Sequence, residues 1–163
     1  MIQLRAATEQ DIPSLLEIYN DAILNTTAVY SYDPVTLAER LAWFRAKQQK
    51  KLPVLVAEQS TGIVGFSTYG PFRAWDAYQY TVENSVYVHP DCRGQGIGKQ
   101  LLSALIEQAK IAKIHAMVAG IDATNAASIG LHSQFDFVQV AHFREIGYKF
   151  DRWLDLVFME RLL

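Results

Sequence analysis

The sequence predicts a mixed α/β domain, and three observations lead to this prediction. Half of the 163 residues are hydrophobic, which suits one globular domain with a sizeable core. Short apolar or alternating stretches, typical of strands, are interspersed with segments whose apolar residues recur at helical spacing. No repeat, low-complexity tract or linker interrupts this order. We therefore expect residues 1–163 to form a single domain of the α/β (α+β) class.

The first half of the chain is expected to contain three strands and two helices. Alternating or continuous apolar residues mark the strands, and apolar residues three or four positions apart mark the helices. In chain order, these elements are a strand at 2–6, a helix that Thr8 or Asp11 starts and that reaches Ile23, a helix from Pro34 to about Gln49, and a hairpin of strands 53–58 and 63–69. An aromatic loop at 70–78 ends this half.

The second half is expected to contain four strands and two helices. In chain order, they are a strand at 80–89, a helix at 98–111, a buried strand at 114–121, a short helix at 125–134, a strand that begins at 137–140, and a closing strand at 153–159. The complete predicted order is strand, two helices, three strands, helix, strand, helix and two strands.

The segment from Ser85 to Leu102 is the most informative part of the chain. An apolar, β-branched stretch stops at Pro90, and an amphipathic helix pattern begins near Gly98. Between them lie Arg93 and a cluster of glycines at 94, 96 and 98. Unpaired amides at a helix start carry partial positive charge, and glycines let the backbone approach a phosphate closely. The segment therefore predicts a binding turn for a phosphorylated cofactor.

Two familiar phosphate motifs do not fit this turn. A Walker loop needs Ser or Thr after Gly-Lys, whereas Gln100 follows Gly98 and Lys99 here. The glycines are also spaced one residue too tightly for the dinucleotide fingerprint G-x-G-x-x-G. The pattern that fits is Arg-x-x-Gly-x-Gly, from Arg93 to Gly98.

This run resembles the acetyl-CoA signature of the GCN5-related N-acetyltransferase (GNAT) superfamily, and the resemblance covers nearly the whole chain. Three further segments, Thr81–Val88, Phe150–Asp155 and Asn25–Ala28, are similar to its phosphinothricin and methionine sulfoximine acetyltransferase branch. The resemblance implies a mostly antiparallel, twisted sheet with helices on both faces and central strands that splay apart around acetyl-CoA. It also implies acetylation of the α-amino group of a small amino acid, and a homodimer.

Glu83 is the candidate general base. It shares a strand face with Ser85 and Tyr87, and a carboxyl within an apolar strand should have a raised pKa. The alternative is an edge glutamate that faces solvent. The branch assigns the matching glutamate as the base, so direct acetyl transfer is expected here, with the proton passing to Glu83 directly or through a water.

The resemblance also implies the residues that line the two ligand sites. Expected substrate-site residues are Arg73, Ala74, Trp75, Glu83, Asn84 and Ser85. Expected acetyl-CoA contacts are Val86, Tyr87, Val88, Arg93, Gly94, Gln95, Gly96, Ile97, Gly98, Lys99 and Asn125. Arg73 could bind a substrate carboxylate as a bidentate pair, or it could be an exposed surface arginine.

Two positions depart from the superfamily pattern. His132 stands where many members carry the tyrosine that protonates the thiolate, so it could donate a proton or only pack. Asp136 stands where a glycine usually ends the short helix in a left-handed conformation, which Asp tolerates at some cost. We expect a slightly weaker helix end at Asp136 and no loss of activity.

Composition argues against several other classes of protein. The net charge of −2 does not favour nucleic acid as a partner, and no apolar window of about 18 residues could span a membrane. The N-terminus lacks a signal peptide, so we expect a soluble cytoplasmic protein. The single cysteine, Cys92, excludes an internal disulfide, and we do not expect it to be a nucleophile. His115 and His142 have no second ligand at metal spacing, so no metal is expected.

Two alternative functions remain open from the sequence. One is an acetyltransferase for a peptide or protein N-terminus, which would need an open groove. The other is a noncatalytic acyl-CoA sensor, which would keep the glycine turn and lack a base. Trp75 in the aromatic loop favours a small closed pocket over the first, and Glu83 argues against the second.

Overall fold

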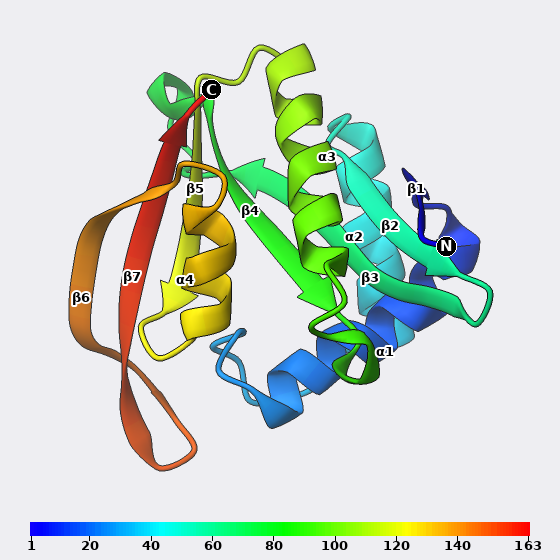
Figure 1. Ribbon diagram of the computed structural model, residues 1–163, viewed down its shortest axis with the longest axis horizontal. Helices are drawn as coiled ribbons and strands as arrows, with labels where there is room; N and C mark the ends of the chain where they lie inside the picture. The colour runs from blue at the N-terminus through cyan, green and yellow to red at the C-terminus, as the bar shows by residue number, and fades with distance from the viewer.

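Seven strands form one sheet in the order β1-β2-β3-β4-β5-β7-β6 in the computed structural model, which describes residues 1–163. The strands are β1 (Gln3–Ala6), β2 (Val54–Gln59), β3 (Gly62–Pro71), β4 (Thr81–Val88), β5 (Ala116–Asp122), β6 (Val138–Lys149) and β7 (Arg152–Leu162). The helices are α1 (Ile12–Asn25), α2 (Leu37–Gln49), α3 (Ile97–Ile111) and α4 (Ala126–Ser133). The expected mixed α/β fold and element order are confirmed (Figure 1).

The helices cover both faces of the sheet, and each face has its own apolar core (Figure 1). On one face, Leu15 of α1 and Phe44 of α2 pack around Phe66 of β3, and all three are buried. On the other face, Leu102 and Leu105 of α3 lie in a second cluster with residues of β4, β5 and β7. Helix α3 thereby fixes the end of the glycine turn that precedes it.

Strand β4 is fully paired on one side and mostly unpaired on the other. It pairs antiparallel with β3 from Pro71↔Val82 to Gly65↔Val88. Its parallel pairing with β5, the one parallel contact in the sheet, covers only Thr81 to Glu83. Beyond Glu83 the two central strands diverge, so the expected splay is confirmed.

The second helix begins later than the sequence suggested. Pro34 was expected to open it, but α2 begins at Leu37 with Thr36 as its N-cap. The Glu39 amide donates to the Thr36 hydroxyl at 3.2 Å, and the Thr36 amide donates to the Glu39 carboxylate at 2.6 Å. This reciprocal capping box satisfies two backbone amides at the start of the helix. Pro34 has no side-chain acceptor that could do so, and the helix therefore starts after Thr36.

The C-terminal strands are longer than expected. β7 runs from Arg152 to Leu162, and β6 continues to Lys149, so a two-residue turn of Phe150 and Asp151 joins them. The φ angles of these turn residues are 53° and 54°. Asp adopts this conformation more readily than most residues, but phenylalanine is not a turn residue, so the sequence pattern did not locate the turn.

Asp136 takes the left-handed conformation expected from its position after α4, with φ of 62°. The amides of Phe135 and Phe137 on either side both donate to the His132 carbonyl, at 2.9 and 3.2 Å. These bonds end the helix and lead the chain into β6.

None of the helices is long and apolar enough to cross a membrane.

Candidate active site

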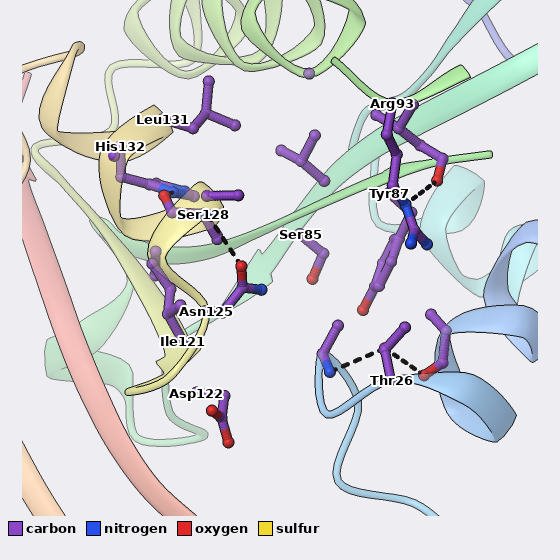
Figure 2. A pocket seen from close by; sticks show the side chains of 18 of the residues that line it. Thr26, Ser85, Tyr87, Arg93, Ile121, Asp122, Asn125, Ser128, Leu131 and His132 are labelled. Atoms are coloured by element: carbon purple, nitrogen blue, oxygen red, sulfur yellow. Dashed lines mark hydrogen bonds between the residues drawn. The ribbon is translucent and has the colours of Figure 1, made fainter. Parts of the chain in front are cut away.

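The divergence of β4 and β5 opens a cavity of about 1060 Å³. Figure 2 shows Ser128 and His132 of α4, with the N-cap residue Asn125, on one side of it and Tyr87 and Arg93 on the other. The lining also includes the first residues after α1 and the turn between β4 and α3. The site therefore draws on segments from the N-terminal third to the last helix of the chain.

The glycine turn lies at one end of this cavity and fits a phosphate group. Gly94 and Gly96 have φ angles of 76° and 78°, and no atom lies within 4 Å of a Cβ placed on either. No side chain caps the amides at the start of α3, so these amides remain available to an anion. Arg93 lies beside them, where its guanidinium contacts the Val88 carbonyl at 3.4 Å and Asp21 at 3.3 Å.

Strand β4 presents alternate side chains to the two faces of the sheet. Tyr87 packs against Tyr19 of α1 and Phe66 of β3, with ring centroids 5.5 and 5.0 Å apart. By the alternation of a strand, Ser85 and Glu83 face the same side, as predicted. Asn84 points to the opposite face, where it meets α4. The cavity thus has an α1 side that carries Glu83 and an α4 side that carries Asn84.

Glu83 occupies the point at which the two strands part. Its side chain is half-buried, and burial raises the pKa of its carboxyl above the ordinary value. Its Oε1 atom lies 3.0 Å from the position that a Cβ of Gly120 would occupy. Gly120 of β5 therefore leaves the space into which the carboxylate projects. A half-buried carboxylate with a raised pKa binds a proton more strongly than an exposed carboxylate does.

Asn84 and His132 join the sheet to α4 at the same level. The side-chain amide nitrogen of Asn84, Nδ2, donates to the Val118 carbonyl of β5 at 3.3 Å. The side-chain oxygen of Asn84, Oδ1, lies 3.1 Å from His132 Nε2. His132 Nδ1 lies 2.8 Å from the Ser128 carbonyl. Both of these oxygens only accept, so a neutral His132 ring, which has one N–H, donates to one of them at a time. Burial lowers the pKa of His132. We call this set of contacts the Asn84–His132 clamp.

The structure brings most of the predicted site residues to the cavity, but not all. Asn125 lines it as the N-cap of α4, accepting from the Ser128 amide at 3.1 Å. The lining further includes Val86, Tyr87, Val88, Arg93, Gly94, Gly96, Ile97, Gly98 and Lys99. Gln95, Arg73, Ala74 and Trp75 are absent from it. Trp75 is 67% exposed, and the Arg73 guanidinium lies 5.6 Å from the Phe72 ring.

Sequence reasoning missed the role of Gly120 and of the segment that follows α1. A lone glycine within the buried run from Ala116 to Ile121 is a signal of close backbone or side-chain approach. The segment Thr26–Tyr30 lines the cavity, and although Asn25–Ala28 contributed to the resemblance, no role in the site was predicted for this segment from the sequence.

Two further residues that were considered from the sequence, as a nucleophile and as a metal ligand, are Cys92 and His142. Cys92 is partly buried and lines the cavity near Arg93. His142 Nε2 lies 2.8 Å from the Asp155 carboxylate, on the exposed surface of β6 and β7. No group of three or more His, Cys, Asp or Glu side chains is placed to hold a metal ion.

Comparison with known proteins shows what this chain is similar to. The family description "Acetyltransferase (GNAT) domain" matches residues 4–158. An L-methionine sulfoximine/L-methionine sulfone acetyltransferase of Pseudomonas paraeruginosa is 48% identical over 158 residues, 96% of this chain and 92% of the relative.

Two solved structures are similar over almost the whole chain. A ribosomal-protein-alanine N-acetyltransferase from Brucella melitensis has a TM-score of 0.97 at 46% identity and covers 99% of each chain. A GNAT superfamily phosphinothricin acetyltransferase from Sinorhizobium meliloti, in complex with acetyl-CoA, has a TM-score of 0.96 at 36% identity, covering 99% of this chain and 88% of that one.

The Asn84–His132 clamp predicts a specific stability loss. Asn84→Ala leaves the Val118 carbonyl and His132 Nε2 without their partner in a buried setting, so the free energy of unfolding should fall by about 1–3 kcal/mol. Denaturant unfolding measures this change. Asn25→Ala is the matched control, because its exposed bond to Asp21 should contribute less than about 0.5 kcal/mol. Equal stability losses in the two variants would contradict the clamp.

Proposed function

This chain belongs to the GNAT acetyltransferase family, and from that premise we propose the reaction it catalyses. It transfers the acetyl group of acetyl-CoA directly to the α-amino group of a small amino acid or analogue of the methionine sulfoximine, methionine sulfone or phosphinothricin type. The observation that carries the proposal is the position of the half-buried Glu83 carboxylate at the fork between β4 and β5, where partial burial raises its pKa. The names of the relatives from Pseudomonas and Sinorhizobium support the substrate class.

Acetyl-CoA supplies an activated thioester to this site. The free amides at the start of α3 and the turn at Gly94 and Gly96 are suited to its diphosphate. Beyond Glu83, the edge of β4 that faces β5 has no strand partner, so backbone groups around Val86 and Val88 can bind an extended arm. The cavity continues from the turn to the fork, which gives such a ligand one path.

Glu83 then removes the proton that prevents the amine from attacking. An ammonium group has no free electron pair, so a base must accept its proton, directly or through one water. Burial favours the protonated form of Glu83, which increases its proton affinity. Gly120 matters because a side chain there would compete with the carboxylate for space.

Arg73 remains our proposed ligand for the substrate carboxylate, together with the neighbouring Ala74 and Trp75. These residues are exposed and lie outside the cavity lining of their own chain. The loop that carries them must therefore approach the cavity when substrate binds, or reach the cavity of a second copy. The other proposed substrate-site residues line the cavity directly, and they are Glu83, Asn84 and Ser85.

We also propose that residues 1–163 act as one acetyltransferase domain and that the protein is a homodimer. Strand β6 lies at the edge of the sheet and exposes large apolar side chains, which favour association with another chain. These side chains are Val138, Val140, Phe143, Ile146 and Tyr148. Light scattering during size-exclusion chromatography should give the mass of two chains, whereas a single-chain mass over a broad concentration range would contradict the dimer.

A second candidate function is acetylation of a peptide or protein N-terminus, because the similar Brucella structure carries the name of a ribosomal-protein-alanine N-acetyltransferase. The other alternative, a noncatalytic acyl-CoA sensor, gives no reason for a half-buried glutamate at the fork. One assay distinguishes the three functions, since only the first two release free CoA and they differ in the amine that they accept.

Thiol release from acetyl-CoA should be measured against methionine sulfoximine, methionine sulfone, phosphinothricin, ordinary amino acids, simple amines and N-terminal peptides. The proposed function predicts saturable turnover with the first three compounds. Turnover with peptides alone would move the function to protein N-termini and remove the role of Arg73. Thermal stabilisation by CoA without any turnover would favour the sensor.

Glu83→Gln tests the base. The amide cannot accept the proton, so kcat should fall about 10²- to 10⁴-fold while the affinity for acetyl-CoA stays nearly unchanged. In the wild type, kcat/KM should fall as the pH drops through the raised Glu83 pKa, above the ordinary glutamate value of about 4.3. Glu107→Gln, on the exposed surface of α3, is the control. Wild-type turnover in Glu83→Gln would exclude this carboxylate as the base.

A further inference from the structure

Lys149, the last residue of β6, is buried without a carboxylate partner. Only 3% of it is exposed, yet its ammonium group forms no ion pair. Its Nζ donates instead to the backbone carbonyls of Thr26 at 2.7 Å, Val29 at 2.8 Å and Ile23. An ammonium group has three protons, so these carbonyls satisfy all of them.

These carbonyls belong to the end of α1 and the segment that follows it. Ile23 is in the last turn of α1, and Thr26 is the C-cap residue. The last carbonyls of a helix lack helical partners and carry partial negative charge, which a cation stabilises. Lys149 is more than a hundred residues away in sequence, so it ties the end of α1 to the tip of the β6–β7 hairpin.

Two tyrosines attach the same segment, which we call the Thr26–Tyr32 loop, to the C-terminal strands. The Tyr30 hydroxyl lies 3.0 Å from both the Asp122 carboxylate and the Asp155 carbonyl. Its ring sits so close to Gly147 of β6 that a Cβ there would stand 2.7 Å away. The Tyr32 hydroxyl donates to the Tyr148 carbonyl at 2.6 Å. The loop therefore has anchors along most of its length.

The Thr26–Tyr32 loop walls the cavity on the side that carries Glu83. Residues 26–30 line the cavity, and in Figure 2 Thr26 lies across from Asp122 and near Tyr87. Gly120 faces Glu83, so Asp122, two residues further along β5, faces the same side. An amine that binds beside the Glu83 carboxylate therefore lies against this wall, on the face of β4 opposite the Asn84–His132 clamp.

We propose that Lys149 is a positioning residue for the amine substrate, acting by holding the Thr26–Tyr32 loop as a fixed wall of the substrate site. The inference rests on the proposed function, because it needs an amine that binds beside Glu83. Lys149 contacts neither the glycine turn nor α4, so it has no comparable influence on the acetyl-CoA site. Loss of its three N–H donors should therefore raise the KM for the amine more than the KM for acetyl-CoA.

Lys149→Met tests the proposal, because methionine keeps much of the length of the side chain and removes its donors. The KM for the amine should rise about tenfold or more, since a small misplacement of a binding wall is costly, while the KM for acetyl-CoA changes less than about twofold. Hydrogen exchange should accelerate in residues 26–32 and stay unchanged in α3. Lys110→Met is the matched control, because Lys110 pairs with Glu107 on the exposed surface of α3.

Equal rises in both KM values, or unchanged exchange in the Thr26–Tyr32 loop, would overturn the proposal. If Lys149→Met does not fold, Tyr32→Phe replaces it, since this variant removes only the bond to Tyr148. It should shift the amine KM and the loop exchange in the same direction by a smaller factor, and no shift would count against the anchored wall. A wild-type protein without turnover on any amine would refute the proposed function, whereas the exchange comparison would still decide whether Lys149 holds the loop.

Discussion

The ladder of hydrogen bonds between β4 and β5 stops at Glu83, and the site depends on this interruption. Unpaired strand edges inside a protein are costly unless another group satisfies them. The Asn84–His132 clamp satisfies one backbone group at the end of this ladder, because the side-chain amide of Asn84 donates to the carbonyl of Val118, the last residue of β5 that pairs with β4. Beyond that point the strands separate, which leaves room for a ligand and exposes backbone groups that an extended ligand can bind.

The two sides of the fork have different chemical characters. The α4 side is buried and internally bonded through Asn84 and His132. The α1 side holds Glu83 against Gly120, with a loop that Lys149 and Tyr30 anchor from the C-terminal strands. The cavity that runs from the glycine turn to the fork therefore brings a ligand at the turn and a ligand beside Glu83 into one continuous space.

The sequence allowed prediction of the parts that rest on local signals. The strand, turn and helix from Ser85 to Leu102 follow from residue patterns and glycine placement, as does the shared face of Glu83, Ser85 and Tyr87. The Asn84–His132 contact spans 48 residues and has no local signal. The substrate-site roles of Arg73, Ala74 and Trp75 rest on residue type and on resemblance, and they remain predictions.

The central claim is that the fork raises the proton affinity of Glu83, and its carboxyl can be titrated directly. Protein carrying ¹³C-labelled glutamate should be titrated by NMR, with the Glu83→Gln spectrum assigning the resonance of interest. We expect a pKa above the ordinary glutamate value of about 4.3, because burial disfavours the charged form. A Glu83 pKa at or below that value would contradict the account, since the fork would then give this carboxylate no advantage as a base.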